Sequence, residues 1–386
     1  DLNPGPPVRP TQEPYSPKSQ MAALLNPTAR RLAVAASRRL ATPPAVEPLV
    51  AHWSTQARHN SSLVEVNGGF AEMVAGTQRY YVLGGKGGVG KTSLAASLAV
   101  KFANHGEPTL IVSMHPANSL GDTLEQDLSG GKIVPVNGVD SLFAAEVGHV
   151  NAKEESSSFP SSMSNILGKI GLSVLADPMG INKLHEMLLK TPGSGEAVAI
   201  SKLMQIVELQ ESNKFRRVVL DTGATGHTLN LLSAATLMGK FLSMANKALN
   251  VASSYPALKS VFDPAKIDEL RQQIAGVCDI MQDPQLTEFL ILTIPTVMAI
   301  AESSRFHASL KKDGAPATRL IINQVLPPSA SECRFCGVKR KEETRALNMI
   351  SADPELGGLK LIQAPLQDVE VKGVPALRFF GDVVWK

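Results

Sequence analysis

The sequence has few cysteines, few aromatic residues and no long apolar run. Three cysteines in 386 residues are too few for a disulfide framework and fit a reducing compartment. Aromatic residues make up 5% of the chain, so the core should be aliphatic and rich in methionine. The longest apolar run, Phe289–Ala301, is interrupted by polar residues and is shorter than the roughly 18 residues of a membrane span. We therefore expect a soluble protein.

The chain also has little excess of one charge over the other. The net charge of +3 is too small to predict binding to nucleic acid on electrostatic grounds, so no nucleic-acid partner is expected. Most of the excess positive charge lies near the N-terminus, where the one acidic residue between positions 21 and 61 is Glu47. In a helix, Arg30, Arg31 and Arg38 would share one face.

This basic, acid-poor composition is typical of an organellar transit peptide. We expect residues 1–70 to be a disordered leader and transit segment outside the fold. A basic amphipathic helix favours the mitochondrial matrix over the chloroplast stroma. The protein would be cytoplasmic if the leader is not a transit peptide.

The rest of the chain alternates short apolar runs with helical patterns. Such alternation is typical of an α/β fold, in which helices cover both faces of a parallel sheet. Helices are expected to begin after Lys91, Gly226, Ala299 and Lys339. The six predicted strands are Tyr80–Leu83, Thr109–Ser113, Val218–Leu220, Phe289–Ile294, Leu320–Asn323 and Leu359–Gln363.

Residues 150–285 contain a second kind of pattern. Apart from the strand at 218–220 and the residues around it, this region is helical, rich in Met and Leu, and without comparable strand signals. It predicts an α-helical subdomain inserted into the α/β domain of residues 71–386. Its apolar stripes, such as Met163, Ile166, Leu167 and Ile170, form either an ordinary buried face or a groove for apolar peptide.

A phosphate-binding loop follows the first predicted strand. The segment 84–93 satisfies G-x-x-x-x-G-K-[ST] and lies between a strand and an Ala/Leu-rich helix. Lys91 should reach the β- and γ-phosphates of ATP, and the Thr92 hydroxyl should coordinate Mg²⁺. The expected nucleotide-binding residues of the loop are Gly85, Lys86, Gly87, Gly88, Val89, Gly90, Lys91, Thr92 and Ser93.

Two further charged residues belong to this predicted site. Asp221 ends the strand at 218–220, where an acid beside the loop strand binds Mg²⁺ through water; the alternative is an Asp that caps the following turn. Lys86 is either a solvated loop charge or the first lysine of the deviant loop G-K-G-G-V-G-K-T. In that subclass this lysine reaches the nucleotide of a partner subunit.

Cys333 and Cys336 have the spacing of metal ligands. A closed zinc site needs four such ligands, and one chain offers two, so a two-fold homodimer would complete a shared Zn²⁺ site. A redox pair and two ordinary thiols are the alternatives.

Together these residues resemble the ArsA/Get3 family of ATPases, over roughly residues 70–386. The chain is most similar to plant organellar members of the branch that targets tail-anchored membrane proteins. The resemblance implies a homodimer with a shared zinc, and adenine held by Asn323 and the loop around Pro365. It also implies a composite groove of Met-rich helices, closed by ATP, for a client's transmembrane segment. A membrane receptor is a further possible partner.

The chain departs from the family pattern in both switch segments. The first switch of the family reads S-T-D-P-A-H-S-L, and here His115 replaces the Asp that orients the attacking water. In the second switch, Gly223-Ala224 replaces an Ala-Pro pair. We therefore expect tight ATP binding with weak turnover, since positioning a nucleophile contributes about 10²–10⁴-fold. Asp122 still matches the family's switch and could substitute in part.

The catalytic residues expected from these motifs are Lys86, Lys91, His115 and Asp122. The leading hypothesis is an ATPase of the tail-anchored-protein targeting type. The alternatives are a non-hydrolysing ATP sensor or scaffold, and an ATPase of the arsenite-pump type that energises a transporter.

Overall fold

The computed structural model describes most of the predicted α/β domain. The described residues are 69–115, 119–129, 132–146, 204, 207, 214–230, 232–233, 264–331 and 333–386. The predicted leader and most of the predicted helical insertion, with its Met-rich stripes, lie outside them. Within these residues, no helix is both long enough and apolar enough to cross a membrane.

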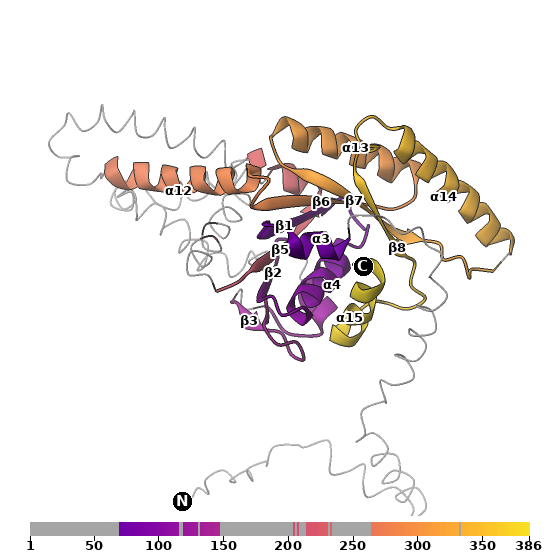
Figure 1. Cartoon of the computed structure of the whole chain (residues 1–386), viewed down its shortest axis with the longest axis horizontal. Helices are drawn as coiled ribbons and strands as arrows, with labels where there is room; N and C mark the ends of the chain where they lie inside the picture. Colours follow the sequence, from indigo (N-terminus) through magenta and orange to yellow (C-terminus); the bar gives the residue numbers. More distant parts are fainter. Residues whose placement is uncertain are drawn as a thin grey trace, which may run out of the picture. The chain divides into compact units, whose positions relative to one another are not determined.

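An eight-stranded sheet forms the centre of the domain (Figure 1). Its strand order is β3-β4-β2-β5-β1-β6-β7-β8, and every pairing is parallel except that of β3 with β4. The carboxyl ends of the parallel strands therefore share one edge. The strands are β1 (Tyr80–Gly85), β2 (Thr109–Ser113), β3 (Val134–Pro135), β4 (Leu142–Glu146), β5 (Arg217–Ala224), β6 (Thr287–Thr293), β7 (Ala317–Val325) and β8 (Lys360–Pro365).

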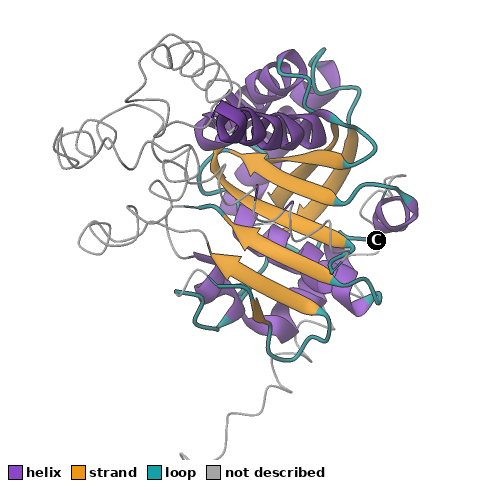
Figure 2. Cartoon of the chain, turned by 90° about the vertical axis from the view of Figure 1, so that its left-hand side faces the viewer, coloured by secondary structure: helices purple, strands orange, loops and turns teal. Residues whose placement is uncertain are grey.

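Helices cover both faces of this sheet (Figure 2). On one face, α3 (Phe70–Ala75), α4 (Lys91–Asn104), α5 (Ser119–Leu124) and α15 (Gly373–Val384) pack against alternate strand residues such as Tyr81 and Leu83. On the other face, α12 (Pro264–Gln282), α13 (Val297–Lys312) and α14 (Arg334–Ala352) pack against Tyr80 and Val82. The period-2 alternation of buried strand residues thus supplies two aliphatic cores.

The α/β prediction is confirmed, with corrections at the level of single elements. All six predicted strands are present, but β3 and β4 were not predicted. Helices α13 and α14 begin at Val297 and Arg334, earlier than expected, and residues 225–230 are helical. The predicted domain boundary at residue 70 falls at the start of α3, whose Phe70 is buried.

Buried ion pairs close the amino end of the sheet. Arg217 begins β5, pairs with Glu107, and donates to the carbonyl oxygens of Gln78 and of Val74, the latter at 2.8 Å. Arg319 of β7 pairs with Glu288 of β6 and with Glu72 of α3, the latter at 2.9 Å. Helix α3 is thereby attached to the strands at this end.

Candidate functional site

The phosphate-binding loop lies at the carboxyl edge, between the central strand β1 and helix α4. Gly88 and Gly90 have φ of +80° and +86°, a left-handed conformation that favours glycine. A Cβ atom on Gly85 would lie 2.2 Å from the carbonyl oxygen of Leu292, and one on Gly90 would lie 2.4 Å from Nδ2 of Asn323. Close packing therefore favours glycine at position 85, backbone conformation favours it at position 88, and both favour it at position 90.

Lys91 is the first residue of α4 and is buried. Its Nζ donates a hydrogen bond to the carbonyl oxygen of Lys86 at 3.0 Å, so the lysine closes its own loop. Burial lowers the pKa of Lys91, while Asp221 and Glu302 act in the opposite direction. A bound polyphosphate would add negative charge beside this ammonium group and favour its charged form.

Asp221 lies beside the loop and beside β2. In the sheet register it is opposite Leu83 of β1 and Ser113 of β2. Its Oδ2 accepts hydrogen bonds from Oγ1 of Thr92 at 2.8 Å and from Oγ of Ser113 at 3.0 Å. The structure thus brings together Thr92 and Asp221, which are 129 positions apart in the sequence.

The second oxygen of this carboxylate is unsatisfied. Asp221 is fully buried, and Oδ1 has no hydrogen-bond partner among the described residues. Burial raises the pKa of Asp221, although the hydrogen bonds from Thr92 and Ser113 oppose that shift. A buried carboxylate oxygen without a donor, next to a threonine hydroxyl, fits the all-oxygen coordination of Mg²⁺.

The end of the first predicted switch also contacts the loop. Oγ of Ser119 lies 3.2 Å from Oγ1 of Thr92. Glu146, buried at the end of β4, accepts the backbone N–H groups of Leu120 and Gly121 at 2.7 and 3.0 Å. A carboxylate at a helix N-terminus stabilises the orphan N–H groups there, so Glu146 anchors α5 beside Thr92.

His115 is close to the Asp221 carboxylate. Its backbone N–H donates to Oγ of Ser113 at 3.3 Å, and its imidazole weakly opposes the burial that raises the pKa of Asp221. His115 therefore borders the site where the family's Asp was expected. Residues 116–118 lie outside the described residues.

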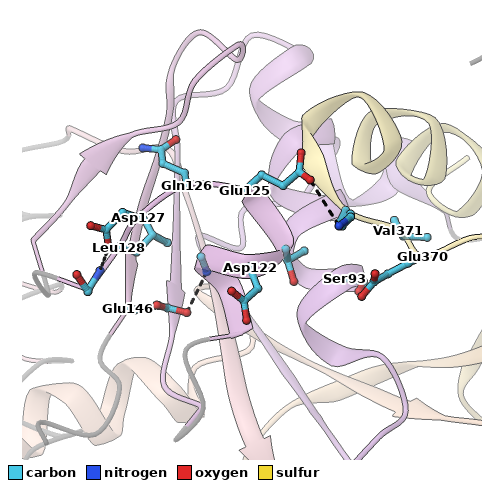
Figure 3. Close-up of a pocket in the computed structure, with 13 residues that line it drawn as sticks. Ser93, Asp122, Glu125, Gln126, Asp127, Leu128, Glu146, Glu370 and Val371 are labelled. Atoms are coloured by element: carbon cyan, nitrogen blue, oxygen red, sulfur yellow. Dashed lines mark hydrogen bonds and ion pairs between the residues drawn. The ribbon is translucent and has the colours of Figure 1, made fainter. Parts of the chain in front are cut away.

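Asp122 lies elsewhere on α5. It is exposed and lines a cavity of about 720 Å³, together with Ser93, Glu125, Glu146 and Glu370 (Figure 3). Asp122 thus shares a cavity with Ser93 of the phosphate-binding loop.

The Lys86 side chain faces an acidic residue of its own chain. Its Nζ lies 3.8 Å from Oε2 of Glu302, in the second turn of α13. Oε1 of the same carboxylate accepts a hydrogen bond from Oγ1 of Thr225 at 2.9 Å. Glu302 was not predicted from the sequence, because no motif marks it.

Asn323 and Pro365 lie near the ends of the neighbouring strands β7 and β8. Nδ2 of Asn323 donates to the carbonyl oxygen of Val89 at 2.9 Å, so this side chain supports the phosphate-binding loop. Pro365 pairs with Val325 in the sheet. Both residues therefore lie at the edge where α/β sheets bind nucleotides.

The two cysteines of the CxxC pair lie at the start of α14. Sγ of Cys333 accepts the backbone N–H of Cys336 at 3.4 Å, and this bond is the main reason that the pKa of Cys333 is lowered to about 7. Both thiols are free, and no group of three or more His, Cys, Asp or Glu side chains among the described residues could hold a metal. A tetrahedral zinc site needs four ligands, and this pair offers two thiols.

A parallel sheet with a G-K-G-G-V-G-K-T loop and a buried acid on the adjacent strand defines the P-loop ATPase class. Residues 78–386 match the family model described as anion-transporting ATPase (ArsA). The chain therefore belongs to this family, the ArsA/Get3 ATPases.

Known relatives support the same assignment. ATPase GET3B of Arabidopsis thaliana is 49% identical over 353 residues, covering 86% of this chain and 85% of the relative. ATPase GET3C of the same plant is 48% identical over 346 residues, covering 86% and 88%. ATPase ARSA1 of Chlamydomonas reinhardtii is 40% identical over 347 residues, covering 83% of this chain and 44% of the relative.

Proposed function

We propose that the chain is an ATP-driven, homodimeric targeting factor that binds hydrophobic transmembrane segments of tail-anchored proteins. The observation that carries the ATP-binding part is the unsatisfied Oδ1 of Asp221 behind the loop of residues 85–92. The client-binding part rests on family membership and on the Met-rich sequence of residues 150–285. The transit-like leader supports an organellar location.

In this proposal the nucleotide lies along the carboxyl edge of the sheet. Backbone N–H groups of the loop and Lys91 would bind the phosphates, and Asn323 and Pro365 would border the adenine. Thr92 would hold Mg²⁺ directly and Asp221 would hold it through water. Mg²⁺ would neutralise charge on the phosphate oxygens.

Client capture tests the proposal most broadly. The full chain is incubated with a fluorescent transmembrane-helix peptide and Mg·ATP, Mg·ADP or no nucleotide, beside a Lys91→Ala variant. Peptide binding that requires ATP and is lost in Lys91→Ala supports the proposal. Binding that ignores nucleotide, or no binding at all, contradicts it. Stimulation of phosphate release by arsenite or antimonite would instead favour a pump-type ATPase.

His115 favours a second candidate, an ATP sensor that hydrolyses slowly. Beside a triphosphate an imidazole is driven towards its charged form, which is not a base. The expected result for His115→Asp is about 10²-fold faster phosphate release or more, with ATP affinity little changed. An unchanged rate would show that the histidine does not limit turnover.

We also propose that Cys333 and Cys336 of two chains share one Zn²⁺. The low pKa of Cys333 supports this, because zinc binds the thiolate. Metal analysis of the purified protein should give one zinc for every two chains. The double variant Cys333→Ser/Cys336→Ser should contain no zinc and should dimerise less, by light scattering; Cys278→Ser is the matched control. A dimer of full stability without zinc would contradict the shared site.

A further inference from the structure

Glu302 occupies a fixed position at the carboxyl edge of the sheet. Helix α13 begins directly after β6, and the Thr296 side chain caps it by accepting the N–H of Ala299 at 3.4 Å. Phe306, one turn beyond Glu302, is buried below the loop strand, where a Cβ atom on Gly84 would lie 2.6 Å from its ring. The helix is therefore seated against the phosphate-binding loop, and Glu302 is directed at it.

The carboxylate of Glu302 joins two segments that the proposed ATP cycle must move. Oε2 lies 3.8 Å from Nζ of Lys86 in the loop, and Oε1 accepts a hydrogen bond from Oγ1 of Thr225 at 2.9 Å. Thr225 follows β5 directly, four positions after Asp221. A single side chain thus links the loop lysine to the second switch.

The charges around Glu302 indicate how a bound triphosphate would affect this link. Lys86 and Lys91 place two ammonium groups in one loop, and Glu302 favours the charged form of Lys91 while it pairs with Lys86. A triphosphate would bring further negative charge to the same place. It would repel Glu302 and compete with it for Lys86.

We propose that Glu302 is a positioning residue that holds Lys86 and Thr225 in the resting arrangement, and that a triphosphate displaces Lys86 from it. This inference rests on the proposed homodimeric ATPase and on the role that the deviant loop implies for Lys86, which is to reach the nucleotide of the partner subunit. The Lys86–Glu302 pair then opposes binding of ATP, which takes Lys86, but has little effect on binding of ADP.

Glu302→Gln tests this idea because its amide oxygen still accepts the hydrogen bond from Thr225, while its charge is lost. Affinities of the full chain for Mg²⁺ with a non-hydrolysable ATP analogue, and for Mg·ADP, are measured by calorimetry. Both side chains of the pair are about one-third exposed, at 35% and 27%, so its contribution is modest. The expected gain is about 1.5- to 5-fold in analogue affinity, with ADP affinity unchanged.

Three variants separate positioning from a purely structural role. In a Lys86→Gln background the effect of Glu302→Gln should vanish, because the two groups act as a pair. Glu302→Asp, whose carboxylate is too short to reach Lys86, should also tighten analogue binding. Glu355→Gln is the matched control, because Glu355 pairs with His307 and Lys311 of the same helix, away from the loop.

Unchanged or weaker analogue binding in folded Glu302→Gln would overturn the inference, and so would an equal gain in the Lys86→Gln background. If Lys91→Ala binds nucleotide as tightly as the wild-type chain does, the proposed function itself is overturned. The two failures are therefore distinct.

Discussion

Both ends of the sheet contain buried charged side chains, but these side chains differ in whether their polar atoms have partners. At the amino end, Arg217 pairs with Glu107, and Arg319 pairs with Glu288 and Glu72. At the carboxyl end, Asp221 is equally buried, yet within the described residues its Oδ1 has no donor. A paired buried charge holds elements together, whereas a buried charge with an unsatisfied polar atom indicates a candidate ligand-binding site.

The largest effect is expected from breaking the amino end. Arg217→Ala would leave Glu107 buried without its main partner, so the free energy of unfolding should fall by about 3–5 kcal/mol. Urea denaturation measures this loss. ATP affinity of the remaining folded protein should be unchanged.

Arg216→Ala is the matched control. Arg216 also lies 3.0 Å from Glu107, but its side chain is 63% exposed, so its loss should cost about 0–1 kcal/mol. Equal losses in the two variants would show that burial does not distinguish these pairs.

A smaller effect of opposite sign is expected at the carboxyl end. Burial raises the pKa of Asp221, which means that its ionised form is a cost to the nucleotide-free fold. Asp221→Asn should therefore stabilise the nucleotide-free chain, by less than the loss expected for Arg217→Ala.

The same variant should lose its response to ligand. At Mg·ATP concentrations near 100 times Kd, binding stabilises the wild type by about 2.7 kcal/mol, and Asp221→Asn should lose most of this gain. Thermal melting with and without Mg·ATP measures both effects. A destabilised nucleotide-free variant would mean that Asp221 is a structural charge like those at the amino end.

The smallest effect is expected from Ser113→Ala. This change removes one of the two hydrogen bonds to Oδ2 of Asp221, and Thr92 retains the other. A loss of about 0.5–1.5 kcal/mol in the free energy of unfolding is expected from urea titration. A loss as large as that of Arg217→Ala would contradict the view that Asp221 is only partly satisfied.

The sequence was most informative where local pattern and burial agree. Aliphatic runs such as Thr109–Ser113 predicted their strands, because strands buried on both faces are continuously apolar. Strand β4 was missed because Leu142–Glu146 is short, contains two alanines and ends in a charge. The first turns of α14 were missed because Cys333, Gly337 and several charged residues interrupt any apolar pattern.

The site shows the same division. Gly85–Thr92 is a contiguous motif, and Asp221 follows a clear strand, so both could be found from the sequence. Glu146 and Glu302 could not, because their roles depend on which distant segments the sheet order brings to one edge. A carboxylate that ends a strand or begins a helix turn has no local signature for such contacts.

The Mg²⁺ dependence of ATP affinity is the most direct test of the claim that the carboxyl edge of the sheet binds Mg·ATP. Equilibrium binding of ATP to the full chain is measured with Mg²⁺ and with EDTA, for the wild type, Lys91→Ala and Asp221→Asn. The account predicts that Mg²⁺ tightens binding to the wild type, that Lys91→Ala abolishes binding, and that Asp221→Asn binds ATP with little response to Mg²⁺. Equal affinity of the wild type in Mg²⁺ and EDTA, or full binding by Lys91→Ala, would contradict it.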